Sequence, residues 1–348
     1  MAERTAFFVG GGSIGHIGPA IAVARALQRQ VPDCRIRFLC SSRAEDREFI
    51  ERQGFLASPL PAPRLSFSFP WKFLQAYNAA RDLLVQHEPS VIFSKGGYVS
   101  VPVCLAARRL GIPIMLHESD AVSGWANRLV ARWADSICLG VDRETHNTPR
   151  YVVTGNPIDP GITQGSRDDG LGLTGLSGTR PILLVLGGSQ GSLAVNEAVA
   201  ANLDDLLAVC DIIHITGKSK KTIRRAHAGY WQIPFAFEEY PHLFALADLA
   251  VSRAGAGVIA ELAANGIPAI LVPLRGVAHD HQELNARAAE ASGGCVVLEQ
   301  GRLDEHLVPA VRKLLEPREQ ARMSHAIRSL SRPDAARQIA EMIGRYLA

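Results

Sequence analysis

Residues 248–286 have the sequence DLAVSRAGAGVIAELAANGIPAILVPLRGVAHDHQELNA, and this stretch decides the fold. Its apolar runs at 249–252 and 269–272 predict two short buried strands, and residues 258–264 predict a helix between them. Gly266 and Pro268 end that helix. A strand–helix–strand unit of this kind is typical of a parallel α/β sheet.

The turn at 253–257 consists mainly of glycine and alanine, which let the backbone approach a ligand closely. The helix that follows exposes free N–H groups, which bind anions. Glu261 lies one turn further on and can accept both hydroxyls of a ribose, while His281 and Gln282 can bind a sugar. A solvated Glu261, and a helix that simply begins at His281, remain the plainer alternatives for each residue alone. Their order along one unit favours a nucleoside diphosphate sugar.

Length and composition narrow the class of protein. The 348 residues suffice for two domains, and 47% of them are hydrophobic. With 37 basic and 34 acidic side chains, the charge is too balanced for a dedicated nucleic-acid binder. No apolar run is long enough to span a membrane, and the N-terminus shows no signal-peptide pattern. The six scattered cysteines predict buried, reduced thiols rather than zinc or disulfides.

The chain starts with a second strand–glycine loop–helix pattern. Residues 5–9 predict a strand, and Gly10–His16 (GGGSIGH) leads into a helix. Gly10, Gly12 and Gly15 also match the dinucleotide-binding pattern, and Arg43 after the second strand suits an NADP phosphate, so an NADP-linked oxidoreductase stays open. His16 lies where open α/β sheets bind ligands and suits a general base at neutral pH. Hydrogen bonding to the loop backbone is the alternative role for it.

Two further glycine loops follow predicted strands. SKGGYVS occupies residues 94–100, and GGSQGS occupies residues 187–192. Successive backbone N–H groups in such loops can hold phosphates. The polar, glycine-rich residues 158–180 between them predict an interdomain linker.

Residues 64–77, RLSFSFPWKFLQAY, gather much of the small aromatic content. Serines and Pro70 interrupt the run, which predicts a loop more than a core strand. Aromatic side chains flanked by Arg64 and Lys72 suit contact with an anionic bilayer, and ordinary core packing is the alternative.

Taken together, these motifs resemble the MurG family of glycosyltransferases. SRAGAGVIAE and HDHQELNA resemble its donor loops, GGSQGS and GGYVS its other glycine loops, and GGGSIGH its GGTGGH loop. The resemblance implies the GT-B fold, with two Rossmann-like, doubly wound α/β domains facing across a cleft. It also implies an inverting enzyme without metal or cofactor, at the cytoplasmic face of the membrane. Such an enzyme moves N-acetylglucosamine from UDP-N-acetylglucosamine to the C4 hydroxyl of lipid-linked N-acetylmuramyl-pentapeptide (lipid I), giving lipid II for peptidoglycan.

The resemblance also implies domain bounds: residues 1–157 bind acceptor and membrane, 181–330 bind the donor, and 331–348 form a helix returning to the first domain. His16 is the expected base. The expected acceptor-binding residues are Gly12, Gly96, Gly97 and Tyr98. The expected donor-binding residues are Ser13, Ile14, Gly15, Asp120, Ser189, Phe237, Ala256, Gly257, Val258, Ile259, Ala260, Glu261, His281 and Gln282. The expected membrane contacts are Leu65, Phe67, Phe69, Trp71 and Phe73.

The chain departs from the family pattern at three positions. Ile14 replaces a glycine, Asp120 replaces an asparagine, and Asp159 replaces an arginine. These changes leave open a glycosyltransferase of the same fold with another lipid acceptor, and also a binding protein that has lost activity.

Overall fold

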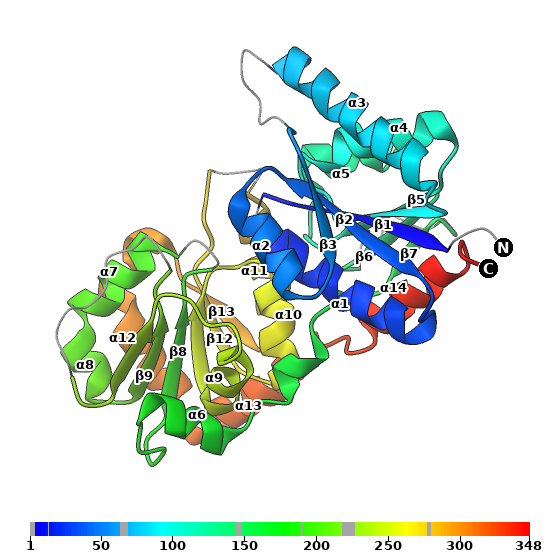
Figure 1. Ribbon diagram of the computed structural model, residues 1–348. Helices are drawn as coiled ribbons and strands as arrows, with labels where there is room; N and C mark the ends of the chain where they lie inside the picture. Colours follow the sequence, from blue (N-terminus) through cyan, green and yellow to red (C-terminus); the bar gives the residue numbers. More distant parts are fainter. Residues whose placement is uncertain are drawn as a thin grey trace. The chain divides into compact units, whose positions relative to one another are not determined.

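The computed structural model describes residues 4–12, 14–62, 69–142, 148–188, 191–217, 227–276 and 280–348. The chain forms two compact units, shown in Figure 1. The first comprises residues up to Asp159 together with Arg332–Ala348, and the second comprises Pro160–Ser331.

In the first unit, the described residues form a seven-stranded sheet in the order β3-β2-β1-β4-β5-β6-β7, with every pair parallel. The strand order turns back between β1 and β4, and this is where open α/β sheets bind ligands. The strands are β1 (Thr5–Val9), β2 (Arg35–Ser41), β3 (Leu56–Leu60), β4 (Val91–Ser94), β5 (Ile114–Glu118), β6 (Ser136–Leu139) and β7 (Tyr151–Val153). The helices are α1 (Ile14–Gln30), α2 (Ala44–Arg52), α3 (Phe69–His87), α4 (Ser100–Leu110), α5 (Trp125–Val130) and α14 (Ala335–Gly344).

Alternate residues of β1 enter two hydrophobic cores on opposite faces of this sheet. Phe8 packs among Phe38 and Phe93, with both ring-centroid distances at 5.2 Å, in the core beneath α1 and α14. Phe7 belongs to the core beneath α3 and α4. The C-terminal helix α14 lies along α1 (Figure 1), and it buries Ile339 and Ile343 completely. The end of the chain thus completes the first unit.

The second unit repeats the plan with strand order β10-β9-β8-β11-β12-β13, again all parallel among the described residues. Its order turns back between β8 and β11. The strands are β8 (Ile182–Leu186), β9 (Asp211–Ile215), β10 (Tyr230–Ile233), β11 (Leu249–Ser252), β12 (Ala269–Leu271) and β13 (Cys295–Val297). The helices are α6 (Arg167–Thr174), α7 (Leu193–Ala201), α8 (Leu203–Leu207), α9 (Tyr240–Leu246), α10 (Ala256–Asn265), α11 (His281–Glu290), α12 (Leu303–Leu314) and α13 (Pro317–Arg328), with 3-10 turns η1 (Pro160–Thr163) and η3 (Gln300–Arg302).

The stretch expected as a linker, residues 158–180, has a different structure. It holds η1 and α6, whose N-cap Ser166 accepts a hydrogen bond from the Asp169 N–H at 3.1 Å. Its glycines allow close packing on α9, because a Cβ at Gly165 would lie 2.0 Å from the Pro241 carbonyl oxygen. A Cβ at Gly170 would likewise lie 2.7 Å from the His242 carbonyl oxygen. These glycines therefore serve close contact rather than a flexible connection.

Two helix starts also differ from expectation. Residues from Phe69 onward form α3 rather than a loop, because Pro70 fits the first turn of a helix, where its missing N–H is not needed. The helix after the first glycine loop begins already at Ile14. Ile14 therefore has helical backbone, which a β-branched residue tolerates well.

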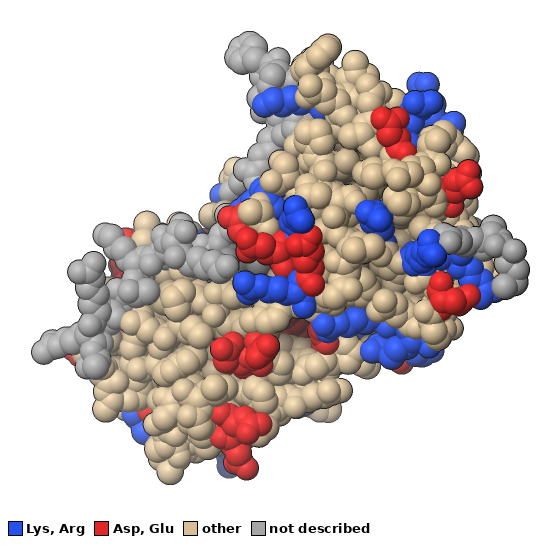
Figure 2. All heavy atoms as spheres, viewed as in Figure 1, with Lys and Arg blue, Asp and Glu red and all other residues tan. Residues whose placement is uncertain are grey.

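All six cysteines are free and buried, as the sequence predicts. Burial raises the pKa of the Cys34 thiol to about 11 and that of Cys40 to about 12. Among the described residues, no helix is long and apolar enough to cross a membrane. The face seen in Figure 2 carries Lys and Arg interspersed with Asp and Glu, in line with the balanced composition.

Candidate functional site

The two glycine loops of the first unit meet where the strand order turns back. Gly12 has φ of +90°, and a Cβ there would lie 2.8 Å from Cε1 of Tyr98. A Cβ at Gly97 would lie 3.2 Å from the Gly11 carbonyl oxygen. The expected acceptor residues Gly12, Gly97 and Tyr98 are therefore in one place, and a side chain on Gly12 would collide with the tyrosine ring.

The backbone of Gly12 is already hydrogen-bonded within the protein. Its N–H donates to Asp46 Oδ2 at 2.6 Å, and its carbonyl accepts from the Arg43 guanidinium at 2.8 Å. Asp46 is buried and also accepts from the Ser41 hydroxyl at 2.6 Å. The Gly12 backbone therefore fixes the shape of the loop. The Arg43 guanidinium is already engaged by the Gly12 carbonyl, which argues against a role for Arg43 in binding an NADP phosphate.

His16 is the third residue of α1 and is half-buried. Its carbonyl oxygen would lie 3.4 Å from a Cβ at Gly10, so it borders the same loop. Gly15 beside it is exposed. Ser13 and the Ile14 side chain lie outside the described residues.

The carboxyl end of β5 adds a buried carboxylate to this edge of the sheet. Glu118 is 3% exposed and accepts from the Asp120 N–H at 3.1 Å and from Asn127 Nδ2 at 2.9 Å. Glu118 thus holds the Asp120 loop in place, and Asp120 itself is half-buried. His117 is buried against the Gly155 carbonyl at 3.0 Å, and burial lowers its pKa well below the usual value, so it is a packed residue.

In the second unit, the N-termini of α7 and α10 differ. The Ser192 hydroxyl caps α7 by accepting from the Val195 N–H at 3.3 Å. Helix α10 has Gly255 as its N-cap, and no side chain caps it. A Cβ at Gly257 would meet nothing within 4 Å. The first N–H groups of α10 therefore have no side-chain cap, as an anion site at residues 256–260 would require, and that site stays a prediction. Ser189 lies outside the described residues.

Glu261 follows in the second turn of α10 and is half-buried. Its Oε2 accepts a hydrogen bond from the Tyr240 hydroxyl at 3.0 Å. Burial and this carboxylate together raise the tyrosine pKa well above its usual value, so the hydroxyl stays a donor.

Phe237 lies in the turn before α9, and its N–H donates to Glu239 Oε2 at 3.0 Å. The Phe237 N–H is therefore already engaged within the protein, and the side chain is half-buried.

His281 and Gln282 are the first residues of α11 rather than loop residues. Gln282 Oε1 accepts from the Leu274 N–H at 3.0 Å, which holds the loop after β12 against the helix. Asn285, which the sequence analysis did not single out, is buried and donates to the Ala254 carbonyl at 3.3 Å. It ties α11 to the glycine turn after β11.

A buried polar network, which the sequence analysis missed, links α7 to β9 and β10. Asn196 donates to the Thr216 carbonyl at 3.0 Å, and its Oδ1 lies 3.1 Å from His214 Nε2. Since Oδ1 can only accept, Nε2 carries the proton, and Nδ1 accepts from the Tyr230 hydroxyl at 2.9 Å. The sequence does contain a signal for this network, because His214 is a histidine within the apolar run of β9.

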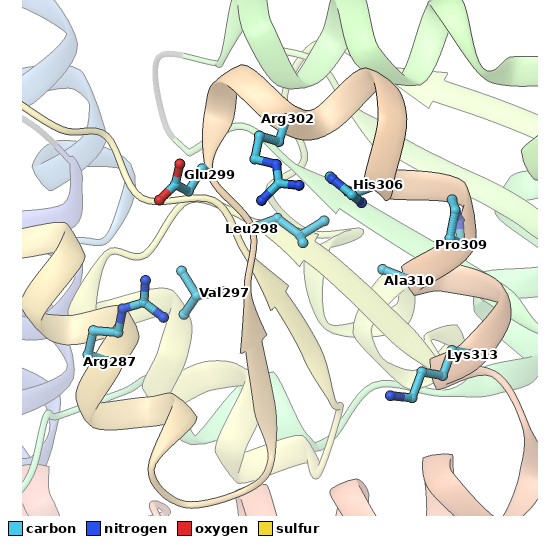
Figure 3. A pocket seen from close by; sticks show the side chains of 9 residues that line it. All are labelled: Arg287, Val297, Leu298, Glu299, Arg302, His306, Pro309, Ala310 and Lys313. Carbon is cyan, nitrogen blue, oxygen red and sulfur yellow. The ribbon is translucent and has the colours of Figure 1, made fainter.

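A groove of the second unit lies away from these residues. Figure 3 shows it lined from α11, the end of β13 and α12, with Arg287, Arg302 and Lys313 among its residues. It contains none of the predicted site residues. A smaller hollow beside Leu274 and Gln300 adjoins the loop that Gln282 holds. We place the candidate site at the glycine loops, because ligands of parallel sheets bind at the carboxyl ends of the strands.

Comparison with known proteins identifies the family. The family model "Glycosyltransferase family 28 N-terminal domain" matches residues 6–139, and "Glycosyltransferase family 28 C-terminal domain" matches residues 182–339. A protein of Lachnoclostridium phytofermentans is 37% identical over 346 residues, which is 96% of each chain. Its name is UDP-N-acetylglucosamine–N-acetylmuramyl-(pentapeptide) pyrophosphoryl-undecaprenol N-acetylglucosamine transferase. The chain belongs to the MurG family of glycosyltransferases.

Other MurG relatives agree with this assignment. A Shouchella clausii protein of the same name is 36% identical, covering 90% of this chain and 91% of its own. The crystal structure of Acinetobacter baumannii MurG aligns with TM-score 0.77 and 26% identity over 98% of this chain and 99% of that one. The calicheamicin glycosyltransferase CalG4, with TM-score 0.71 and 14% identity over 100% and 99% of the chains, shows the fold alone. The prediction of two doubly wound domains in a GT-B glycosyltransferase is confirmed.

The predicted membrane contacts lie partly within the described residues of this MurG-family chain. Trp71 at the start of α3 is 67% exposed, whereas Phe73 is half-buried. Leu74, which was not among the predicted contacts, is 49% exposed. Leu65, Phe67 and the Phe69 side chain lie outside the described residues. Trp125, which the sequence analysis missed, is 71% exposed at the start of α5, with Arg128 5.7 Å from its ring centroid.

Proposed function

We propose that the chain transfers N-acetylglucosamine from UDP-N-acetylglucosamine to the C4 hydroxyl of undecaprenyl-pyrophosphoryl-N-acetylmuramyl-pentapeptide, forming lipid II for peptidoglycan. The observation that carries this proposal is the 37% identity, over 96% of both chains, to a relative named for that reaction. The match runs through both units, so it includes the loops expected to bind donor and acceptor alike.

The donor would bind at the carboxyl edge of the second sheet. The uncapped N–H groups of α10 suit the diphosphate, because a helix N-terminus carries partial positive charge. Glu261 accepts a hydrogen bond from the Tyr240 hydroxyl, and as a carboxylate it would also accept hydrogen bonds from the ribose hydroxyls. Phe237 offers an apolar face for the uracil, and the half-buried His281 and Gln282 begin α11 near the sugar.

The acceptor would bind at the glycine loops of the first unit. The Gly97 N–H has no hydrogen-bond partner among the described residues, so it is available to a phosphate oxygen. The Tyr98 ring closes one side of the loop. Asp120, which is expected at the donor, would accept rather than donate a hydrogen bond at a hydroxyl of the donor sugar.

The reaction would be a direct displacement with inversion at C1 of the donor sugar. His16 takes the proton from the C4 hydroxyl as that oxygen attacks, which is general base catalysis. The N–H groups of α10 stabilise the charge that develops on the leaving UDP. Neither step requires a metal or a covalent intermediate.

The enzyme would act as a peripheral protein at the cytoplasmic face of the membrane, where its lipid-linked acceptor is anchored. Trp71, Leu74 and Trp125 expose apolar area on the first unit. Nearby Lys72 and Arg128 suit anionic headgroups.

A test of this function measures UDP release with both substrates and with each one alone. We expect release to require UDP-N-acetylglucosamine together with a short-chain lipid I analogue. Release with a diacylglycerol but not with the lipid I analogue would instead indicate a glycosyltransferase with another lipid acceptor.

A further inference from the structure

Lys95 is a lysine buried at the centre of the first unit. It follows β4 directly and is 1% exposed. Its N–H donates to the Val9 carbonyl at 2.8 Å, and its Cβ would lie 3.4 Å from a Cβ at Gly10. It therefore lies where the glycine loops after β1 and β4 meet. Burying an ammonium group is unfavourable, so its position calls for a reason beyond packing.

The charged surroundings of Lys95 come from the neighbouring strands. Its Nζ donates to the Ser119 hydroxyl. Burial lowers its pKa to about 8, while the carboxylates of Glu118 and Asp120, and then Cys138 on β6, act in the opposite direction. His117 also faces it and is kept neutral by burial and by the lysine charge. The charge of the ammonium is thus balanced electrostatically by the carboxylates of Glu118 and Asp120.

The loop that follows Lys95 is closely packed against Asn127 of α5. Gly96 has φ of +87°, and a Cβ there would lie 2.2 Å from Asn127 Oδ1. That oxygen is buried, and it has no hydrogen-bond partner among the described residues. The Gly97 N–H is available as well. The loop therefore leaves no room for a side chain at Gly96, and it carries an available N–H two residues after the buried Lys95.

We propose that Lys95 is a positioning residue for the diphosphate of the acceptor. Its ammonium anchors the loop after β4 to the loop after β5 through Ser119, and it provides a fixed positive charge beneath the Gly96–Gly97 backbone. It acts through these loops, since it is too deeply buried to contact the ligand. This inference rests on the proposed function, because that function supplies an acceptor with a diphosphate.

The test variant is Lys95→Met, which removes the positive charge but keeps an unbranched side chain of similar length. Affinity for a short-chain lipid I analogue is measured by calorimetry without donor, and KM and kcat are measured in the transfer assay. We expect acceptor affinity to weaken by about tenfold, with donor KM and kcat unchanged, because a charge that does not contact the ligand contributes less than a direct buried charge pair. Lys313→Met, an exposed lysine of the second unit, is the matched control and should change nothing.

The pH dependence provides a second readout. Because the pKa of Lys95 is about 8, the ammonium deprotonates as pH rises through that value. Acceptor KM of the wild type should rise between pH 7 and 9, and the variant should lack this rise. Burial of the charged ammonium destabilises the folded state at pH 7, and this cost decreases as the lysine deprotonates above pH 8. Methionine carries no charge and avoids this cost at pH 7. The melting temperature of Lys95→Met at pH 7 should therefore not fall below that of the wild type.

The possible outcomes separate this inference from the proposed function. Wild-type protein that binds the analogue but transfers nothing would refute the function and leave Lys95 to be judged by binding alone. Equal acceptor affinity in wild type and Lys95→Met would overturn the inference. So would parallel losses in donor KM, acceptor KM and melting temperature, which indicate a purely structural role. No binding to the wild type would refute both proposals.

Discussion

His16 lies in the first turn of α1, beside the loop that packs against Tyr98. If it accepts the proton of the attacking hydroxyl, His16→Gln should lower kcat by about 100- to 10,000-fold, the usual contribution of a general base. Donor KM should stay within twofold. Steady-state kinetics of the purified variant provides the measurement, and His325→Gln, at an exposed position, serves as control. A loss shared equally between kcat and donor binding would contradict the base role.

Glu261, in the second turn of α10, accepts a hydrogen bond from the Tyr240 hydroxyl through Oε2. We expect Glu261→Gln to raise the donor KM by about 10- to 100-fold, because hydrogen bonds to a carboxylate contribute about 1.5–3 kcal/mol. Tyr240→Phe should have a smaller effect of the same kind, since it only removes the group that orients the carboxylate. Calorimetry with UDP gives an independent check. An unchanged donor KM in Glu261→Gln would exclude ribose binding.

For single residues, the sequence predicts where a residue lies in the fold better than it predicts which groups the residue contacts. The glycine spacing located both loops of the first unit, since only glycine tolerates φ near +90° at Gly12. It could not show that Asp46, 34 residues away, occupies the Gly12 N–H. That contact depends on how α2 folds back, which no local pattern contains. The burial of Lys95 could not be predicted for the same reason, because it depends on packing between segments that are far apart in the sequence.

Among the elements, α7 and β9 are joined through the His214 network. Burial lowers the His214 pKa to about 4, whereas an unfolded histidine has a pKa near 6.5. The unfolded state therefore binds the proton more readily, and stability is lost as pH falls from about 6.5 towards 4. For wild type we expect His214 to account for about 2 kcal/mol of the stability lost between pH 7 and 5.

The check is urea unfolding of wild type and His214→Gln at pH 7 and pH 5. The variant should lose less stability over this interval than the wild type, although it starts from a lower value. His325→Gln should keep the wild-type pH dependence, because that side chain is exposed. Identical pH dependence in His214→Gln and wild type would contradict a neutral, buried His214.

Helix α3 offers a test of membrane contact within a single element. Its first turns project beyond α4 (Figure 1), and Trp71 and Leu74 lie on them. Trp71→Ser with Leu74→Ser should weaken binding to vesicles of anionic lipid by about tenfold or more, because two large apolar side chains no longer enter the bilayer. Val85→Ser, at a 52% exposed residue near the other end of α3, is the control. Equal effects of both changes in vesicle sedimentation would refute a local contact.

Element types were easier to predict from sequence than element roles. The period of the apolar residues and the stop signals at Gly266 and Pro268 predicted α10, and Gly266 does end it with φ of +68°. Residues 158–180 were expected to be a linker but contain η1 and α6. Glycine occurs both in flexible chain and where two backbones pack closely, so its presence alone does not distinguish the two. Only the tertiary packing of α6 on α9 distinguishes the two meanings.

Considering the molecule as a whole, α14 completes the first unit from the far end of the sequence. Ile339 is fully buried against α1, so Ile339→Ala should lower the free energy of unfolding by about 2–5 kcal/mol. Hydrogen exchange of peptides from α1 and α14 measures the loss, which should be confined to the first unit. Glu341→Ala removes only an exposed ion pair with Arg337 and should cost little. Faster exchange throughout the second unit would contradict this division.

The two-domain plan follows from sequence because each half repeats strand, glycine loop and helix in the same order. Parallel strands then place every such loop at one edge of a sheet. The sequence could not reveal which N-terminus stays open. Ser192 caps α7 while Gly255 leaves α10 uncapped, and that difference rests on side-chain geometry.

The central claim is most directly tested by the product itself. The protein is incubated with UDP-N-acetylglucosamine and a short-chain lipid I analogue, and the acceptor is analysed by mass spectrometry and by NMR of its new anomeric proton. We predict an acceptor heavier by one N-acetylhexosamine, joined to the C4 oxygen with β configuration. An unchanged acceptor, or an α-linked product, would contradict the proposed inverting transfer.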